Sequence, residues 1–555
     1  MGVVAQTGSR FGVLGRRAIL LIAALLGLFY AQLLGRGFGI EHLSNDGMQY
    51  VVSARHIMAG QGVTTGLQTY PAQQVAPPPV AQRVWPPAYP VALAALASVV
   101  HRPVEAVVGP FALWCVFMSG VLIWLIARDF GAGSWAGAVP ALIWWLLPMP
   151  IVGAGGGQSE SLFTLFTLAF VAVLGWRGRA PAAIGDGAAL LAGLFLSLAF
   201  LTRYQGLAFV AAMAVLSLPV LLLEGRKRPR LLAAAFPFAL VSAQLALNWW
   251  ATGSVRAGSD NRGDLAVGEI LWQVQFGLRA AFGLDADWPA PLPAMLALFS
   301  WLLLAAALVL TRRRRPWLLP TLGWLAAWPV PLICAAMAAA LFAMHLLMAA
   351  TNGATYPFEP RYMEASVALA LLAGTGLGIA SLRRLDGFGR RAVAVGTTVM
   401  LALWIVAITG SARDAGLPFE TRARDDVAHL LAVMKSPVQG RSLAQFLREH
   451  TDAHHGLLAA DGQVLGMLLE RPVAALTEPA YADQVWHEAA AQALACRLNA
   501  RWLVVFPALL AAQASTRQPE DVIARLSRGD GPAGWTPVVD NDDVRILTVC
   551  PSAQR

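Results

Sequence analysis

Apolar runs long enough to cross a membrane recur along the chain as far as residue 410, separated by short polar or charged stretches. A helix rises about 1.5 Å per residue, so about 20 apolar residues span the hydrocarbon core of a bilayer. On this basis we predict a polytopic α-helical membrane protein with about eleven transmembrane helices. They cover roughly residues 17–35, 106–127, 134–152, 159–176, 187–203, 206–223, 231–251, 291–311, 317–337, 363–381 and 391–410. The first run, Ala18–Leu34, lacks a small-residue cleavage site, which favours a retained span over a removed signal peptide.

Two further apolar stretches do not fit this count. Ala88–Val100 follows a Pro-Pro pair and ends before Pro103. It is too short to cross the bilayer, so we expect a re-entrant or interfacial helix. Ala335–Ala350 continues the predicted span at 317–337. Its sequence is compatible with a long helix, a re-entrant hairpin or an additional span.

Short basic clusters set the expected topology. With the N-terminus in the cytoplasm, every cluster between the predicted spans falls on the cytoplasmic side, which is the positive-inside pattern. The clusters are Arg10–Arg17, Arg128, Arg177–Arg179, Arg226–Arg230, Arg312–Arg315 and Arg383–Arg391. Eleven crossings then leave the C-terminus outside.

The composition changes after residue 410, where 14 Lys and Arg face 17 Asp and Glu. Short apolar strands alternate there with a helix, which predicts a small α/β domain over 411–555, outside the membrane. The predicted strands are Leu457–Ala460, Val473–Leu476, Ala500–Phe506 and Val544–Val549, and the helix is Asp483–Leu498. Cys496 and Cys550 lie in this segment, where an oxidising compartment could pair them, whereas Cys115 and Cys334 are expected to be buried in spans.

The whole chain is 57% hydrophobic and only 13% charged, with a mean hydropathy of +0.58. Its net charge of +9 comes from the clusters between spans, so it does not indicate nucleic-acid binding. The glycine-rich segment Gly153–Glu160 lacks the Lys-Ser/Thr of a P-loop. This argues against nucleotide hydrolysis and against an ATP-driven pump.

The first outer loop, at about 36–105, carries the most informative pattern. Ser44, Asn45 and Asp46 offer side-chain oxygens to a helix start, and Gly60 marks the end of that helix. The helix has an apolar face formed by Tyr50, Ala54, Ile57 and Met58. A second segment, Trp85–Pro90, follows downstream with the sequence WPPAYP.

The ordered set of residues in this loop resembles the first outer loop of GT-C glycosyltransferases, which include protein O-mannosyltransferases and lipid A aminoarabinose transferases. The matching residues are Asp46, Tyr50, Ala54, Gly60, Gly62, Pro86, Pro87, Tyr89 and Pro90. The resemblance implies a transferase domain over 1–410 in a bacterial inner membrane. It also implies a polyprenyl-phosphate sugar as donor, a glycan, lipid or protein as acceptor, and a periplasmic tail domain. Asn45 stands where those enzymes have the first residue of an acidic pair, which leaves the branch and any divalent metal open.

Asp46 is the candidate general base. A hydroxyl is a poor nucleophile until a carboxylate within hydrogen-bond reach takes its proton, and the resemblance assigns that role to this position. The alternative is a helix cap, although Ser44 and Asn45 are also able to cap this helix.

Glu160 begins a predicted span, where a carboxylate facing lipid would be costly, so it is expected to face a polar cavity or an ion-pair partner. The alternative is that Glu160 is an ordinary residue of a helix N-terminus, where the helix dipole favours a negative charge. The resemblance implies a site role at this loop, which in some relatives includes binding a metal.

Two arginines at outer helix ends are candidate phosphate ligands, because a guanidinium fork matches two phosphate oxygens. They lie in Thr202-Arg203-Tyr204 and in Glu359-Pro360-Arg361-Tyr362. Snorkelling at the interface is the alternative. Tyr204, Glu359 and Tyr362, together with Tyr50 and Tyr89, complete the predicted substrate-binding set, and His345 is expected to be a packed or interfacial histidine.

A secondary transporter or flippase is the rival interpretation. Such proteins often have two related halves and charged or broken helices at mid-membrane. This chain has no internal repeat, and its candidate charges crowd the outer loops. An inactive relative that serves as an assembly subunit is a third possibility.

Overall fold

The computed structural model describes most of the membrane helices, part of the first outer loop and most of the tail. The described residues are Ile40, 43–68, 79–82, 84–175, 185–223, 228–252, 267–281, 330–352, 360–382, 429–451, 456–459, 462–476, 485–514 and 518–550. The predicted spans at 17–35, 291–311 and 391–410, the first part of 317–337, Glu359 and the boundary at 410 lie outside these residues.

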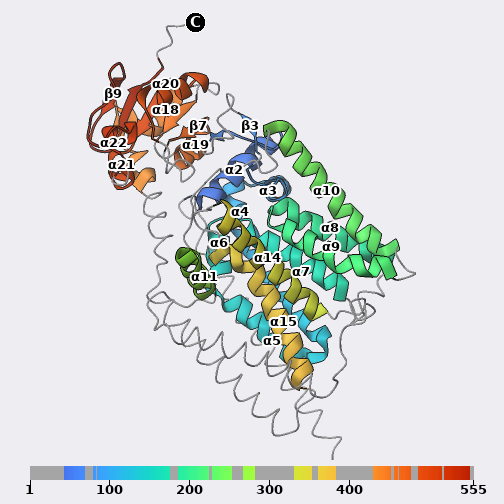
Figure 1. Cartoon of the computed structure of the whole chain (residues 1–555). Coiled ribbons are helices and arrows are strands. Elements are labelled where there is room, and N and C mark those ends of the chain that lie inside the picture. Colours follow the sequence, from blue (N-terminus) through green and yellow to red (C-terminus); the bar gives the residue numbers. More distant parts are fainter. Residues whose placement is uncertain are drawn as a thin grey trace, which may run out of the picture.

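Most of the described part before residue 383 consists of apolar helices (Figure 1). They are α4 (Val104–Ala127), α5 (Gly133–Leu146), α6 (Pro148–Gly155), α7 (Glu160–Gly175), α8 (Asp186–Thr202), α9 (Gly206–Leu223), α10 (Arg228–Thr252), α14 (Val330–Asn352) and α15 (Glu364–Leu382). Within the described residues, Val104–Phe130, Val330–Ala349 and Arg361–Ile379 are long and apolar enough to cross a membrane by themselves. The chain is a membrane protein, and the count of eleven spans stays a prediction.

Two predicted spans differ from the observed helices. The span predicted at 134–152 is a pair of helices, α5 and α6, bent by 48° at Leu147. Pro148 starts the second helix, since proline cannot donate the backbone hydrogen bond that would continue the first. The boundary predicted at 337 is wrong: α14 runs without a break to Asn352, because no glycine or proline follows Pro331 within it. Ala335–Ala350 is therefore the body of one long helix.

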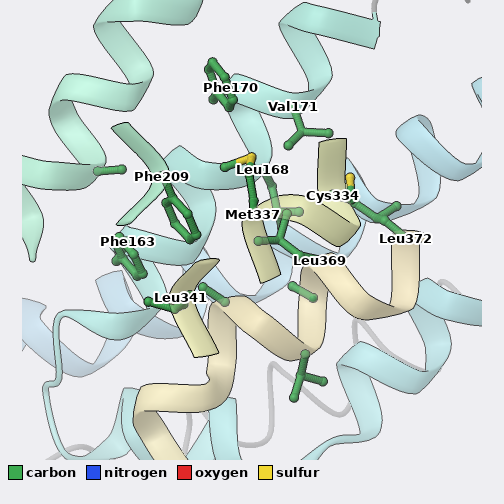
Figure 2. Close-up of a cluster of buried hydrophobic side chains, with 14 of the residues drawn as sticks. Phe163, Leu168, Phe170, Val171, Phe209, Cys334, Met337, Leu341, Leu369 and Leu372 are labelled. Atoms are coloured by element: carbon green, nitrogen blue, oxygen red, sulfur yellow. The ribbon is translucent and has the colours of Figure 1, made fainter. Parts of the chain in front are cut away.

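The bundle is held together by a buried apolar cluster between α7, α9, α14 and α15. Figure 2 shows Phe163 and Phe209 near Leu341, with Met337, Leu369 and Leu372 to their right; the two phenylalanine rings are stacked. These side chains pack α7 against α15, and both helices start beside the candidate site.

The first outer loop forms two short helices, α2 (Asn45–Met58) and α3 (Ala88–Val100), that pack on each other and on α4. The 13-residue helix predicted at Ala88–Val100 is confirmed at both ends. Between them β1 (Thr64–Thr65) pairs antiparallel with β3 (Val80–Ala81).

The tail contains a six-stranded mixed sheet in the order β2-β7-β6-β8-β10-β9. Its strands are β2 (Leu67–Gln68), β7 (Val473–Ala475), β6 (Leu457–Ala459), β8 (Trp502–Val505), β10 (Arg545–Thr548) and β9 (Thr536–Asp540). The four strands from β2 to β8 are parallel, and β10 and β9 are antiparallel to their neighbours. We call residues 429–550 the tail domain, although β2 comes from the first outer loop.

Helices cover both faces of this sheet, because alternate strand residues point to opposite sides. Leu457, Val473 and Trp502 face α18 (Leu443–His450) and α19 (Gln463–Leu469). Leu458, Ala474 and Leu503 face α20 (Glu488–Arg497), α21 (Pro507–Ala514) and α22 (Val522–Ser527). A short hairpin of β4 (Pro437–Val438) and β5 (Arg441–Ser442) precedes α18.

The cysteine predictions are confirmed. Cys496 and Cys550 form a disulfide with a Cα–Cα distance of 5.4 Å, and Cys115 and Cys334 are buried free thiols. The bond ties the end of α20 to the end of β10.

Candidate functional site

The start of α2 is capped by Ser44 and not by Asp46. The Ser44 Oγ accepts from the Gly47 N–H at 3.1 Å and donates to the Gly156 carbonyl at 2.9 Å. The carboxylate of Asp46 turns instead to Arg361, whose Nη1 donates to Oδ2 at 3.0 Å. The capping interpretation of Asp46 is therefore wrong, and its side chain belongs to a group of charges at the end of the bundle next to α2.

Glycines bring α2 unusually close to the turn between α6 and α7. A Cβ atom on Gly47 would lie 2.2 Å from the carbonyl oxygen of Gly156, and Gly157 has φ +68°. Only a residue without a side chain fits at Gly47, because the atom in the way belongs to the backbone. The Asp-Gly pair of the motif thus places a carboxylate directly beside a helix–turn contact.

Two buried ion pairs form the centre of the candidate site. Arg361 faces Asp46, and Arg203 at the end of α8 faces Glu160 at the start of α7 with 2.8 Å between Nη1 and Oε1. Arg361 Nε lies 3.8 Å from the same Glu160 oxygen, which links the pairs. All four side chains are at most 15% exposed. Glu160 thus has an ion-pair partner, as its place at the start of a span predicts.

Tyr362 lies between the two guanidinium groups. Its ring centroid is 4.8 Å from Arg361 Cζ and 5.0 Å from Arg203 Cζ, and its hydroxyl accepts from Arg361 Nη2 at 3.1 Å. The negative face of an aromatic ring attracts cations and helps two like charges share one site.

A hydroxyl pair connects α2 to Arg203. The Tyr50 and Ser159 hydroxyls are hydrogen-bonded at 2.9 Å, and Arg203 Nη1 donates to Ser159 Oγ at 3.1 Å. Burial raises the pKa of Tyr50, and its phenol is neutral and able to donate. Tyr89 is fully buried and packs edge-on against Tyr50, with ring centroids 4.9 Å apart. In this structure its role is to pack against the Tyr50 ring.

Sequence reasoning missed a second layer around Arg203. Its Nε donates to Gln205 Oε1 at 3.2 Å, and the Gln205 amide nitrogen lies 3.0 Å from His345 Nε2. Because that amide is a donor, His345 Nε2 is the acceptor, and its ring stacks on Tyr362 at 6.3 Å. His345 is thus packed, as predicted, but against the site itself. Next to Arg203 in the sequence, the Tyr204 hydroxyl accepts from Asn248 Nδ2 at 2.9 Å.

The arrangement offers a carboxylate and clustered cations at one place. Asp46 Oδ1 has no hydrogen-bond partner among the described residues, and neither has Arg203 Nη2. A free carboxylate oxygen is able to take a proton, and a free guanidinium nitrogen is able to bind an anion. Within the described part of the chain, no three His, Cys, Asp or Glu side chains form a group that could hold a metal ion.

Comparisons with known proteins show which fold this is. No protein-family model matches the sequence, and none of the curated proteins is similar to it. The structure is similar over 96% of its length to ArnT from Cupriavidus metallidurans bound to undecaprenyl phosphate, with a TM-score of 0.53, 14% identity and 98% of that chain covered. It is also similar to the oligosaccharyltransferase AglB from Archaeoglobus fulgidus in complex with an inhibitory peptide and a dolichol-phosphate. That match has a TM-score of 0.51 and 12% identity, and covers 96% of this chain and 74% of AglB.

The chain has the GT-C fold. The resemblance inferred from the first outer loop is thereby confirmed at the level of the fold. In this GT-C structure, Asp46, Tyr50, Glu160, Arg203, Arg361 and Tyr362 form one connected group. Tyr204 and Tyr89 lie beside that group, in contact with Asn248 and Tyr50.

Proposed function

We propose that the protein transfers a sugar from a polyprenyl-phosphate carrier to a hydroxyl of a glycan, lipid or protein acceptor at this site. One observation carries the proposal. A carboxylate at the head of α2 and two guanidinium groups meet at the outer end of a GT-C bundle. The bound undecaprenyl phosphate of ArnT and dolichol-phosphate of AglB support a lipid-linked donor.

Asp46 is the general base in this proposal. Its Oδ2 is held by Arg361, which leaves Oδ1 to accept the proton of the attacking group. The acceptor oxygen forms a bond to the anomeric carbon while the bond from that carbon to the phosphate oxygen breaks. The electron pair leaves with the polyprenyl phosphate, and the proton goes to Asp46.

Arg203 and Arg361 stabilise the departing phosphate. Negative charge grows on the leaving oxygen as the bond breaks, and donors fixed in a nearly dry site act most strongly on such charge. Arg203 still has a nitrogen without a partner among the described residues, so it is able to bind a phosphate oxygen without leaving Glu160. Glu160, Ser159 and Tyr362 hold the guanidinium groups in place.

The decisive experiment is a transfer assay with the purified protein in lipid vesicles and a panel of polyprenyl-phosphate sugars. The Asp46→Asn variant keeps the shape of the side chain but removes the proton acceptor. We expect its transfer rate to fall by at least about 10²-fold, with donor binding near normal.

Asp186→Asn is a matched control, because Asp186 is also an acidic residue in the first turn of a helix but is exposed. It should transfer at the parent rate. Transfer by Asp46→Asn close to the parent rate would overturn the role of Asp46, and transport of donors without any transfer would favour the transporter interpretation.

A further inference from the structure

Arg55, in the last turn of α2, ties this helix to two distant parts of the chain. Its Nη1 donates to the carbonyl of Met467 in α19 at 2.8 Å and lies 3.9 Å from Glu470 Oε1. Its Nη2 forms an ion pair with Glu105 in the first turn of α4. One side chain therefore joins the first outer loop, the membrane bundle and the tail domain.

The same loop also supplies an edge of the tail sheet. β2 pairs in parallel with β7 in the register Leu67↔Val473 and Gln68↔Ala474, and Val473 N–H donates to the Gly66 carbonyl at 2.9 Å. The Leu67 side chain is buried and lies so close to Gly466 that a Cβ there would be 2.3 Å from it. Figure 1 shows α19 and β7 next to α2.

We propose that Arg55 is a positioning residue for sugar transfer, which holds α2 so that Asp46 stays against Arg361. This inference rests on the proposed function. Asp46 and Arg55 occupy opposite ends of one helix, roughly 14 Å apart along its axis. Ser44 and Gly47 fix the first end at Gly156, and Arg55 fixes the second at α4 and α19.

The contact at the second end of α2 limits how far the helix can tilt about its first end. A helix held at both ends moves as one body with its supports, whereas a helix held at one end tilts about that contact. A misplacement of about 1 Å at a reacting group lowers turnover by up to about 10²-fold. Binding of the donor phosphate depends on Arg203 and Arg361, which Arg55 does not touch.

The test compares Arg55→Met, Arg55→Lys and the control Arg448→Met. Met keeps much of the apolar stem but removes the donors, and Lys keeps the charge facing Glu105. Arg448 lies in α18 and donates to the Leu468 carbonyl at 2.7 Å, next to the Met467 carbonyl. This hydrogen bond joins two helices of the tail domain, α18 and α19.

Two measurements are needed, both normalised to folded protein. The first is amide hydrogen exchange over 45–58, which reports how firmly α2 is held. The second is kcat and the donor KM. For Arg55→Met we expect exchange to rise about tenfold and kcat to fall by about 10- to 10²-fold, with the donor KM unchanged. Arg55→Lys should recover part of both losses, and Arg448→Met should match the parent.

Unchanged exchange over α2 in Arg55→Met overturns the inference, and so does faster exchange at unchanged kcat. Exchange is measured without any donor. A parent protein that transfers no sugar therefore refutes the proposed function, while the exchange data still decide whether Arg55 holds α2.

Discussion

At the scale of single residues, the site depends on buried opposite charges that hold each other in place. Each guanidinium contacts a carboxylate, and Tyr362 contacts both guanidinium groups. Removal of one partner leaves the other charge buried and unpaired, which is strongly destabilising. Variants at this site therefore need a measurement of folded protein beside any measurement of transfer.

Arg361→Ala should behave differently from Asp46→Asn. The donor phosphate is present in the ground state and in the transition state, so loss of a cation weakens donor binding as well as turnover. A hydrogen bond to a charged group contributes about 1.5–3 kcal/mol, which corresponds to a donor affinity lower by about 10- to 10²-fold. Equilibrium binding of a polyprenyl phosphate to vesicles that contain the protein measures this.

Arg102→Ala is the control for this prediction. Arg102 is an exposed cation in the turn between α3 and α4, where snorkelling at the interface is its expected role. Equal affinities for all three proteins would show that Arg361 does not bind the phosphate.

Much of this site was predictable from residue types, but its pairing was not. Asp46 lies in the first outer loop, whereas Glu160, Arg203 and Arg361 lie at predicted outer ends of apolar runs. The resemblance to the GT-C pattern, together with the cost of an unpaired charge facing lipid, singled them out. The pairing of Arg361 with Asp46 joins positions 315 residues apart, and no local pattern encodes such a contact. Gln205 and His345 were missed because a neutral polar residue in a helix has many ordinary packing roles.

At the scale of elements, the contact between α2 and the turn before α7 sets the position of the base. Gly47→Ala puts a methyl group into the Gly156 carbonyl, so α2 has to move away. We expect transfer to fall at least about tenfold and the stability to decrease by about 1–3 kcal/mol. Transfer rate and thermal unfolding of the purified variant check this.

Gly187→Ala is the control, because nothing lies within 4 Å of a Cβ at that helical glycine. It should leave transfer unchanged. If Gly47→Ala also transfers at the parent rate, the close backbone contact has no part in positioning Asp46.

Hydrophobic periodicity and proline positions predicted individual elements well. α3 and the ends of α9 agree with the predicted residues, and the four predicted tail strands are present as shorter segments. β9 was missed because Thr536–Asp540 is largely exposed and lacks a buried apolar run. β2 was missed because a two-residue strand acquires its structure only from its partner β7.

At the scale of the whole molecule, the predicted topology depends on basic clusters spread along the whole membrane part of the chain. A phosphatase fused after Arg413 should be active, because this point lies outside in an eleven-span protein, and a fusion within Arg226–Arg230 should be inactive. The disulfide of the tail domain agrees with an oxidising compartment. An inactive fusion at the C-terminus would contradict eleven spans and move the tail domain into the cytoplasm.

The parallel pairing of β2 with β7 has a consequence for how the protein is made. The two strands are separated by roughly 400 residues. At about 5–20 residues per second, a ribosome needs on the order of 20–80 s to synthesise the segment between them. During that time the first outer loop has left the ribosome, while its partner strand does not yet exist. Until β7 is made, Leu67 and Gln68 have no strand partner in this sheet, and a tail domain expressed alone would leave β7 as an unpaired sheet edge.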